Sequence, residues 1–270
     1  MKKTRRLLAL LLAMVMMLAL TVTAGAEEVT TTAAKSEITV IYTNDVHTYI
    51  DKTLSYATVS AMKQDYQKAG KQALLVDAGD HIQGTAYGGM DEGKTIVQLM
   101  NAAGYDIATL GNHEFDYGMA RTLATVKEAK FPYVSCNFYH EKNGVVGDPV
   151  LDSYKVFDMN GTKVAFVGIT TPESFTKSTP AYFQDANGKY IYGIAAGKDG
   201  AALYAAVQKA IDAASKEADY VIALGHLGDD PSSQPWTSEE VIAHTTGLDA
   251  FIDGHSHSTV EGKQVKDKAG

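Results

Sequence analysis

Short runs of β-branched and aliphatic residues alternate with amphipathic stretches from position 38 onward. Apolar runs of this length with polar breaks on both sides are typical of buried strands. The predicted strands lie at 38–42, 73–76, 107–110, 133–138, 164–169, 220–224 and 250–252. Strands that alternate with helices in this way indicate an α/β domain.

Three of the stretches between these strands have helical spacing, because their apolar residues recur every three or four positions. The predicted buried faces consist of Tyr56, Val59, Met62 and Tyr66, of Met119, Leu123 and Val126, and of Leu203, Val207, Ile211 and Ala214. The dipeptide Asn160-Gly161 lies between two apolar runs and is a strong signal for a tight hairpin. The sheet is therefore predicted to be mixed rather than purely parallel.

The first 26 residues have the pattern of a Sec signal peptide. Four cations at positions 2–6 precede an apolar run at 7–20, and positions 24–26 form a small-x-small cleavage site. The apolar run is shorter than the roughly 20 residues of a membrane span, and no cysteine lies near the cleavage site to carry a lipid. We therefore predict export to a periplasm, the cell surface or the exterior, with no stable membrane anchor. Residues 27–37 are polar and Thr-rich and are predicted to form a disordered spacer.

Charge and cysteine content narrow the possible ligands. The chain has 24 Lys and Arg against 32 Asp and Glu, and loss of residues 1–26 would leave 20 cations and a net charge of −12. Such a chain disfavours nucleic-acid polymers and anionic membranes, so a phosphate ligand needs a local cation. The single cysteine, Cys136, excludes an internal disulfide and a Cys-based zinc cluster. It lies in an apolar run and is predicted to be a packing residue rather than a nucleophile.

Five of the predicted strands lead directly into turns that carry potential metal ligands. These turns lie at 43–47, 77–80, 111–116, 225–226 and 253–257. Ligands collect at the carboxyl ends of strands in open α/β sheets, and five of the eight histidines lie in these segments. Each motif alone has an ordinary explanation as a turn or a buried histidine, but the five in this order favour one site.

The ligand types and their number predict the kind of metal site. Seven residues could coordinate a cation: Asp45, His47, Asp80, Asn112, His226, His255 and His257. One catalytic ion takes three or four protein groups, so two divalent ions are predicted. Carboxylate, imidazole and amide ligands together suit Mn, Fe, Co, Ni or Zn. Asp80, the lone acid after the Gly79 turn, is predicted to bridge the two ions.

The series of motifs resembles the calcineurin-like metallophosphatases. It comprises Asp45-x-His47, Gly79-Asp80, Gly111-Asn112-His113-Glu114, Gly225-His226 and Gly254-His255-x-His257. The strings at 112–118 and 253–257 are similar to the branch of secreted 5′-nucleotidases, which includes UDP-sugar hydrolases and 2′,3′-cyclic nucleotide phosphodiesterases. The resemblance implies a four-layer α/β/β/α sandwich over residues 38–270. Family members continue into a nucleoside-binding domain, so the sequence ending at Gly270 is expected to be partial, with that domain absent.

The resemblance also implies roles for individual residues. One ion would be bound by Asp45, His47, Asp80 and His257, and the other by Asp80, Asn112, His226 and His255. The implied catalytic residues are Asn112, His113 and Asp116, the last two as a dyad. Asp116 has a second possible role as a helix N-cap. Glu114, His81, His140 and His244 receive no role.

The leading hypothesis is an exported phosphoester hydrolase that acts on small nucleotides, first of all as a 5′-nucleotidase. Two ions would lower the pKa of a shared water, which would attack phosphorus as hydroxide. His113, oriented by Asp116, would protonate the leaving oxygen. The alternatives are a 2′,3′-cyclic nucleotide phosphodiesterase or UDP-sugar hydrolase on the same site, and a non-catalytic metal-binding surface module. The intact dyad favours an enzyme.

Overall fold

The computed structural model describes residues 37–270. The predicted signal peptide and all of the predicted spacer except Glu37 lie outside the described residues. The first sheet has the order β1-β2-β3-β4 and is parallel, with strands β1 (Thr39–Thr43), β2 (Ala73–Asp77), β3 (Ile107–Thr109) and β4 (Tyr133–Val134). The second has the order β11-β10-β8-β7, with strands β7 (Tyr154–Met159), β8 (Thr162–Thr170), β10 (Tyr220–His226) and β11 (Ala250–Ile252).

A small antiparallel sheet and ten helical segments complete the described part of the chain. The small sheet has the order β6-β5-β9, with strands β5 (Phe138–Lys142), β6 (Val145–Pro149) and β9 (Tyr192–Ile194). The α-helices are α2 (Tyr56–Lys68), α3 (Ala86–Gly89), α4 (Lys94–Ala103), α5 (Met119–Glu128), α6 (Ser174–Lys177), α7 (Ala201–Ala214) and α8 (Ser238–His244). The 3₁₀ turns are η1 (His113–Phe115), η2 (Pro180–Phe183) and η3 (Pro231–Ser233). None of the helices between Glu37 and Gly270 is both long and apolar enough to cross a membrane.

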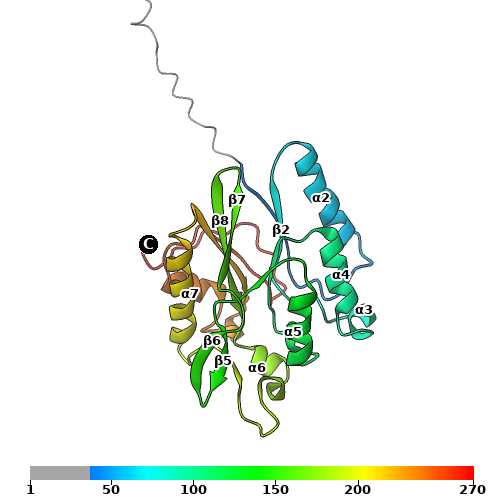
Figure 1. Cartoon of the computed structure of the whole chain (residues 1–270). Helices are drawn as coiled ribbons and strands as arrows, with labels where there is room; N and C mark the ends of the chain where they lie inside the picture. Colours follow the sequence, from blue (N-terminus) through cyan, green and yellow to red (C-terminus); the bar gives the residue numbers. More distant parts are fainter. Residues whose placement is uncertain (1–36) are drawn as a thin grey trace, which may run out of the picture. The chain divides into compact units, whose positions relative to one another are not determined.

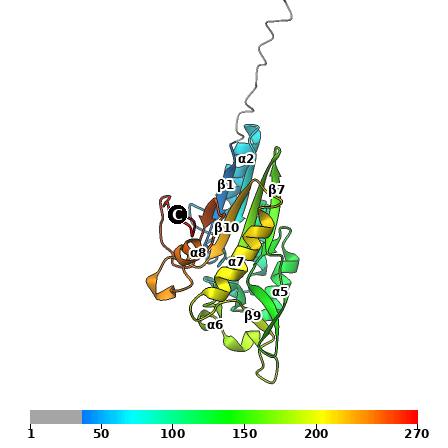
Figure 2. The same cartoon turned by 90° about the vertical axis from the view of Figure 1, so that its left-hand side faces the viewer.

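The two large sheets pack face to face, and helices cover their outer faces (Figures 1 and 2). Successive side chains of a strand point to opposite faces, so a strand that is buried on both faces reads as a continuous apolar run. In β8, Val164 and Phe166 contribute to the core between the sheets, whereas Ala165 and Val167 contribute to the core under α7. This alternation produces three cores and therefore four layers, as the resemblance implied.

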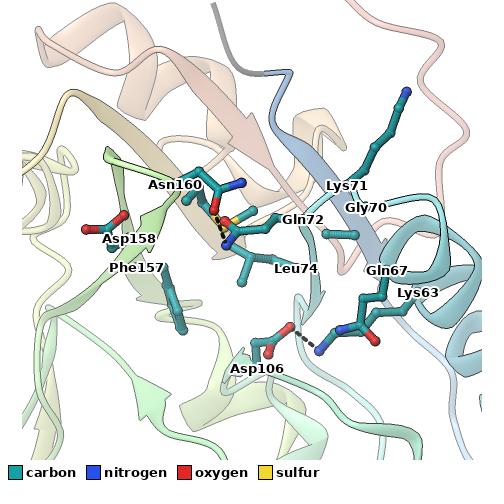
Figure 3. Close-up of a pocket in the computed structure, with 12 residues that line it drawn as sticks. Lys63, Gln67, Gly70, Lys71, Gln72, Leu74, Asp106, Phe157, Asp158 and Asn160 are labelled. Atoms are coloured by element: carbon teal, nitrogen blue, oxygen red, sulfur yellow. Dashed lines mark hydrogen bonds and ion pairs between the residues drawn. The ribbon is translucent and has the colours of Figure 1, made fainter.

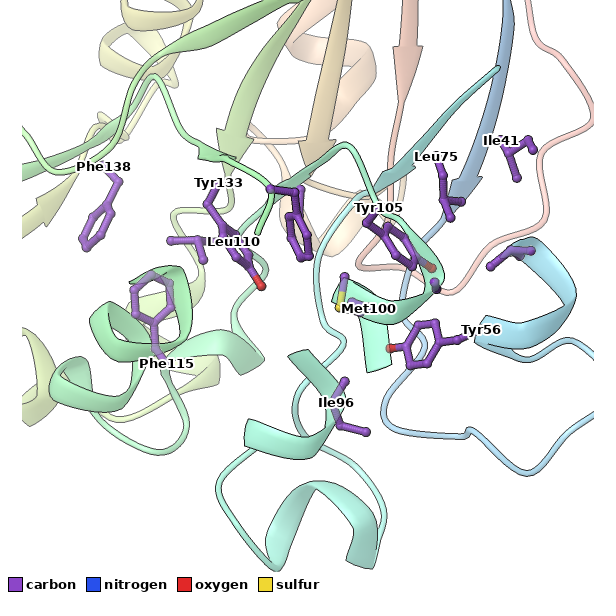
Figure 4. Close-up of a cluster of buried hydrophobic side chains, with 14 of the residues drawn as sticks. Ile41, Tyr56, Leu75, Ile96, Met100, Tyr105, Leu110, Phe115, Tyr133 and Phe138 are labelled. Carbon is purple, nitrogen blue, oxygen red and sulfur yellow. The ribbon is translucent and has the colours of Figure 1, made fainter. Parts of the chain in front are cut away.

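The third core lies between the first sheet and the helices α2, α4 and α5 (Figure 4). Leu75 of β2 points into this core, while its neighbours Leu74 and Val76 point into the core between the sheets. Leu75 and Val76 are fully buried, and each such side chain contributes about 1.5–3 kcal/mol through the hydrophobic effect. Burial on both faces holds β2 rigidly, together with the loop that follows it.

The predicted hairpin is confirmed and makes the second sheet mixed. Strands β7 and β8 pair antiparallel, whereas β8, β10 and β11 pair parallel. Asn160 and Gly161 have φ values of 55° and 89° at the turn. Positive φ at both central residues is the requirement of a type I′ hairpin turn, which Asn-Gly meets at low cost.

The predicted helix faces are confirmed except at one position. Leu203, Val207, Ile211 and Ala214 of α7 are all buried. In α2, Tyr56 and Val59 are buried, but Met62 is 45% exposed, so its predicted burial is wrong. Lys63 takes the inward position instead, and its ammonium group donates to Asp106 Oδ2 and to the carbonyl oxygen of Gly104, both at 2.6 Å.

The predicted strand at 133–138 is two strands in different sheets. The chain leaves the first sheet after Val134 and joins the small sheet at Phe138. Between them, the amide of Cys136 donates to the carbonyl of Gly168, and the Asn137 side chain bonds to Thr170 of β8. Cys136 packs against the core under α7, and burial raises the pKa of its thiol to about 12. These contacts support the packing role predicted for this cysteine.

Candidate metal centre

The five predicted segments meet at one end of the two large sheets. Asp45 follows β1, Asp80 follows β2 and Asn112 follows β3, all in the first sheet. His226 is the last residue of β10, and His255 follows β11, both in the second sheet. Because neighbouring strands in these positions run parallel, their carboxyl ends carry these residues to the same edge.

Three groups of side chains place their ligand atoms within 4.8 Å of one another. They are Asp45, His47 and His257; His47, Asp80 and His113; and Asp80, His226 and His255. Asp80 Oδ2 lies 2.9 Å from His226 Nε2 and 3.9 Å from His47 Nε2. Asn112, the seventh predicted ligand, lines the same cavity as Asp80 and His255. The structure therefore brings all seven residues together, and Asp80 belongs to two of the three groups.

Backbone strain is concentrated in these residues. Nine non-glycine residues between Glu37 and Gly270 have positive φ, and five of them are predicted ligands. Their φ values are 49° at Asp45, 45° at His47, 60° at Asp80, 83° at His255 and 54° at His257. A left-handed conformation costs about 1–2 kcal/mol per residue, and such strain is found mainly at functional sites. The loops are thus shaped to direct these side chains inward at the expense of stability.

Two of the histidines are oriented by backbone carbonyl groups. His47 Nδ1 lies 3.0 Å from the carbonyl oxygen of Gln83, and His226 Nδ1 lies 2.7 Å from that of Ala78. A carbonyl oxygen only accepts, so Nδ1 carries the proton in both rings. Nε2 is therefore the nitrogen of each ring that faces the carboxylates, and in the neutral ring it holds the lone pair that a metal ion would use.

The donors fit a bound cation. Asn112 Oδ1 is buried and has no hydrogen-bond partner, and the buried His226 Nε2 faces the Asp80 carboxylate at 2.9 Å. Burial alone would raise the pKa of Asp80, but the positive charge of His226 outweighs it and lowers that pKa below its usual range. Burial disfavours the charged form of His226, but the Asp80 carboxylate raises the pKa of this imidazole to about 10. The centre thus requires positive charge, which a divalent cation bound by nitrogen and oxygen ligands would provide.

His113 and Asp116 form the predicted pair at the edge of this cluster. His113 Nδ1 lies 2.6 Å from Asp116 Oδ2, and this hydrogen bond is the main cause of the raised pKa of His113. The backbone N–H of His113 donates to Asp80 Oδ1 at 2.8 Å, which joins the pair to the candidate ligands. The His113 ring also belongs to the second group of ligand atoms, so its placement suits both proton transfer and coordination. Asp116 does not cap a helix, because Gly118 holds the N-cap position of α5.

Glu114 received no role from the sequence, yet it joins the two loops that follow β2 and β3. Its buried carboxylate accepts hydrogen bonds from the backbone N–H groups of Asp80 at 2.8 Å, His81 at 2.9 Å and Gly111 at 2.6 Å. His81 lies beside it and is fully buried, with Nδ1 2.8 Å from Asp77 Oδ1. Burial opposes a charge on His81, but Glu114 and Asp77 raise its pKa to about 9. No spacing in the sequence reveals a carboxylate that collects backbone amides.

Gly111, the first residue of the 111–114 motif, leaves no room for a side chain. A Cβ atom at Gly111 would lie 2.1 Å from Asp80 Oδ1. Real Cβ atoms do not approach an oxygen this closely, so any side chain here would displace the carboxylate. The glycine therefore lets the loop after β3 pack directly against Asp80.

Replacing Glu114 by glutamine is expected to lower the free energy of unfolding by about 1–3 kcal/mol, because an amide leaves buried N–H donors without acceptors. Urea unfolding of the metal-free chain measures the effect. Glu128→Gln is the matched control, since Glu128 forms a half-exposed pair with Arg121 of the kind worth about 0–1 kcal/mol. An unchanged unfolding midpoint for Glu114→Gln would show that these amide contacts contribute little.

The cluster opens into a cavity of about 280 Å³. Its lining comprises Asp80, Asn112, His113, Lys177, Asp230, Ser232, Ser233, His255, Ser256 and His257. A larger hollow of about 510 Å³ lies elsewhere, between the end of α2 and the β7–β8 hairpin (Figure 3). That hollow contains the Lys63–Asp106 ion pair and the Gln72–Asn160 hydrogen bond, but none of the predicted ligands. Size alone therefore does not identify the site, whereas the chemistry of the lining does.

Comparison with known proteins gives concordant results. The family described as calcineurin-like phosphoesterase matches residues 38–259. The chain is 30% identical over 247 residues to the 5′-nucleotidase of Diplobatis ommata, covering 84% of this chain and 38% of that protein. It is 29% identical over 258 residues to the 2′,3′-cyclic-nucleotide 2′-phosphodiesterase/3′-nucleotidase of Haemophilus influenzae, covering 84% of this chain and 37% of that protein. The chain thus spans about two fifths of the length of these curated relatives.

A solved structure extends the similarity to three dimensions. The calcineurin-like phosphoesterase YfkN from Bacillus subtilis superposes with a TM-score of 0.65 at 26% sequence identity, covering 83% of this chain and 73% of that chain. The family match over residues 38–259 contains both large sheets and all seven candidate ligands. The chain therefore belongs to the calcineurin-like phosphoesterase family and has its metallophosphatase fold.

Proposed function

We propose that this chain carries the catalytic machinery of an exported phosphoester hydrolase that binds two divalent cations and releases phosphate from nucleotides, first of all 5′-nucleotides. One observation carries the proposal: His113 pairs with Asp116 through its ring and donates its backbone N–H to the candidate ligand Asp80. A purely structural metal site has no use for such a pair. The 5′-nucleotidase relative at 30% identity supports the choice of substrate class.

The two proposed cation sites share Asp80. One set of ligands is Asp45, His47, Asp80 and His257, and the other is Asp80, Asn112, His226 and His255. Nitrogen and oxygen ligands of this kind suit Mn, Fe, Co, Ni or Zn. When bound, two such cations supply charge neutralisation at the phosphoryl oxygens and an activated water for in-line attack.

The chain's own residues handle the proton of the leaving group. Asp116 holds the proton of His113 Nδ1 through the 2.6 Å hydrogen bond, which fixes the ring and leaves Nε2 free. The raised pKa of His113 favours a protonated Nε2, which donates to the leaving ester oxygen as its negative charge develops. The Asp80 carboxylate accepts a hydrogen bond from the backbone N–H of His113, which keeps the His113 ring close to the cluster of candidate ligands.

Two parts of the proposal rest on the sequence and the relatives. Export rests on the signal-peptide pattern of residues 1–26. A 2′,3′-cyclic nucleotide phosphodiesterase is the second candidate, because a relative with that name is 29% identical over a similar length.

The test is phosphate release by the metal-reconstituted chain. Mn²⁺ and Co²⁺ would be added to chelator-treated protein, with AMP, 3′-AMP, 2′,3′-cyclic AMP and UDP-glucose as substrates. An aryl phosphate would report the chemistry without recognition of a base. We expect the highest kcat/KM among the nucleotides with AMP, and no turnover before metal is restored.

The other outcomes separate the alternatives. Faster hydrolysis of 2′,3′-cyclic AMP than of AMP would favour the second candidate. Hydrolysis of the aryl phosphate alone would retain the hydrolase and show that these 270 residues do not select nucleotides by themselves. A folded, metal-loaded chain that hydrolyses none of these substrates would support the non-catalytic metal-binding module.

A further inference from the structure

Glu173 lies in the loop between β8 and α6 and reaches the candidate metal centre from outside. Its Oε2 atom lies 2.7 Å from His255 Nε2 and accepts a second hydrogen bond, also of 2.7 Å, from the Ser233 hydroxyl. The side chains are mostly buried, with 14% of Glu173 and 8% of His255 exposed. One carboxylate therefore joins the loops that follow β8 and β11 to the turn η3.

This contact determines which nitrogen of His255 faces the cluster. A carboxylate only accepts, so His255 Nε2 carries the proton and Nδ1 keeps the lone pair. His47 and His226 have the opposite arrangement, because their Nδ1 atoms are held by backbone carbonyl groups. His255 is thus the one ring among these three that a side chain orients.

The backbone of His255 is fixed from the other side. Its N–H group lies 3.0 Å from both carboxylate oxygens of Asp45, and its φ is 83°. A ligand atom of His255 lies in one group with those of Asp80 and His226, and because Glu173 occupies Nε2, Nδ1 is the nitrogen left to bind a cation there. A histidine held in this way loses little freedom when it binds a cation.

We propose that Glu173 is a positioning residue for one of the two cations, acting through His255. The inference rests on the proposed metal centre and adds a residue outside the seven ligands. A carboxylate on the far nitrogen of a ligating histidine also makes the near nitrogen a stronger donor. Through Ser233, the same carboxylate connects the ligand to the wall of the 280 Å³ cavity.

Titration of Co²⁺ into the metal-free chain, followed by calorimetry and by visible absorption, tests the proposal without relying on activity. For Glu173→Ala we expect the affinity of one site to fall about 10- to 100-fold and that of the other to stay within about twofold. Glu173→Gln should recover most of the loss, because its amide oxygen still accepts from His255 Nε2. Glu240→Gln removes a carboxylate beside the half-exposed His244, outside the metal centre, and should leave both affinities unchanged.

Four results would overturn the inference. Unchanged affinities in Glu173→Ala would show that His255 needs no support from this carboxylate. Equal losses at both sites, or a lower unfolding midpoint of the metal-free Glu173→Gln chain, would show a general structural role. A wild-type chain that binds no Co²⁺ would overturn the proposed function and this inference with it. If the wild type binds two Co²⁺ ions, a negative result for the variants concerns the role of Glu173 alone.

Discussion

Replacing Asp80 by asparagine is expected to empty both cation sites and to lower kcat/KM by about 10³-fold, a loss of several kcal/mol of transition-state stabilisation. Asp80 Oδ2 lies 3.9 Å from His47 Nε2 and 2.9 Å from His226 Nε2, nearer to each than Asp45 Oδ1 at 4.0 and 3.8 Å. Asparagine retains an oxygen that accepts from the N–H of His113, so the loop contact at 2.8 Å is preserved while the charge is lost. Metal content by mass spectrometry and phosphate release would be measured on the same preparation.

Two further variants show whether the effect belongs to a shared ligand. His47→Ala should mainly empty one site, because its ring shares a group with Asp45 and His257 and is not part of the group of Asp80, His226 and His255. Asp212→Asn removes an exposed carboxylate of α7 and should change neither metal content nor rate. If Asp80→Asn retained one cation at full affinity, Asp80 would belong to a single site and the shared-ligand assignment would be wrong.

The α/β class was predictable because each large sheet has a strand buried on both faces, whereas the four layers were implied only by the family resemblance. In β8, alternate residues serve two different cores, and this double burial makes the run at 164–169 continuously apolar. The hairpin was predictable for a local reason, since Asn160-Gly161 matches the backbone that a type I′ turn requires. Both features depend on residues close together in the chain.

The errors arose where tertiary contacts override local pattern. Apolar spacing placed Met62 inside, but Lys63 occupies that position because Asp106 and the carbonyl of Gly104 satisfy its charge. The run at 133–138 reads as one strand, yet the bonds of Asn137 to Thr170 carry the chain from one sheet to another. Neither partner is near in sequence, so no window around Met62 or 133–138 contains the deciding information.

The candidate site also has a part that local sequence predicts and a part that depends on long-range contacts. The clustering of its candidate ligands could be predicted because their segments follow apolar strands, and parallel strands bring their carboxyl ends together. The groups that hold the ligands could not, because Glu114 and Glu173 act through long-range bonds to backbone amides and to His255. A glutamate in a loop has many ordinary roles, and only the folded chain shows which atoms it meets.

Replacing His113 by alanine is expected to leave both cations bound and to lower kcat by about 10²-fold or more, the usual size of a general-acid contribution. Asp116 Oδ2, rather than a backbone carbonyl, holds the ring at 2.6 Å from Nδ1. The ring also lies near the candidate ligands Asp80 and His47. The loss should be smaller for an aryl phosphate than for AMP, because a good leaving group needs little protonation. Steady-state rates with both substrates, together with metal content, measure the effect.

The controls decide between proton transfer and coordination. Asp116→Asn should reproduce part of the loss in kcat with both cations retained, because the amide weakens the hold on His113 Nδ1 without altering any candidate ligand. His244→Ala removes a half-exposed histidine of α8 that stacks on Tyr204, and its rate should equal that of the wild type. If His113→Ala instead lost one cation in proportion to its activity, and added metal restored the rate on both substrates equally, His113 would be a ligand. Its pairing with Asp116 would then orient a metal-binding ring, as the carbonyls of Gln83 and Ala78 orient His47 and His226.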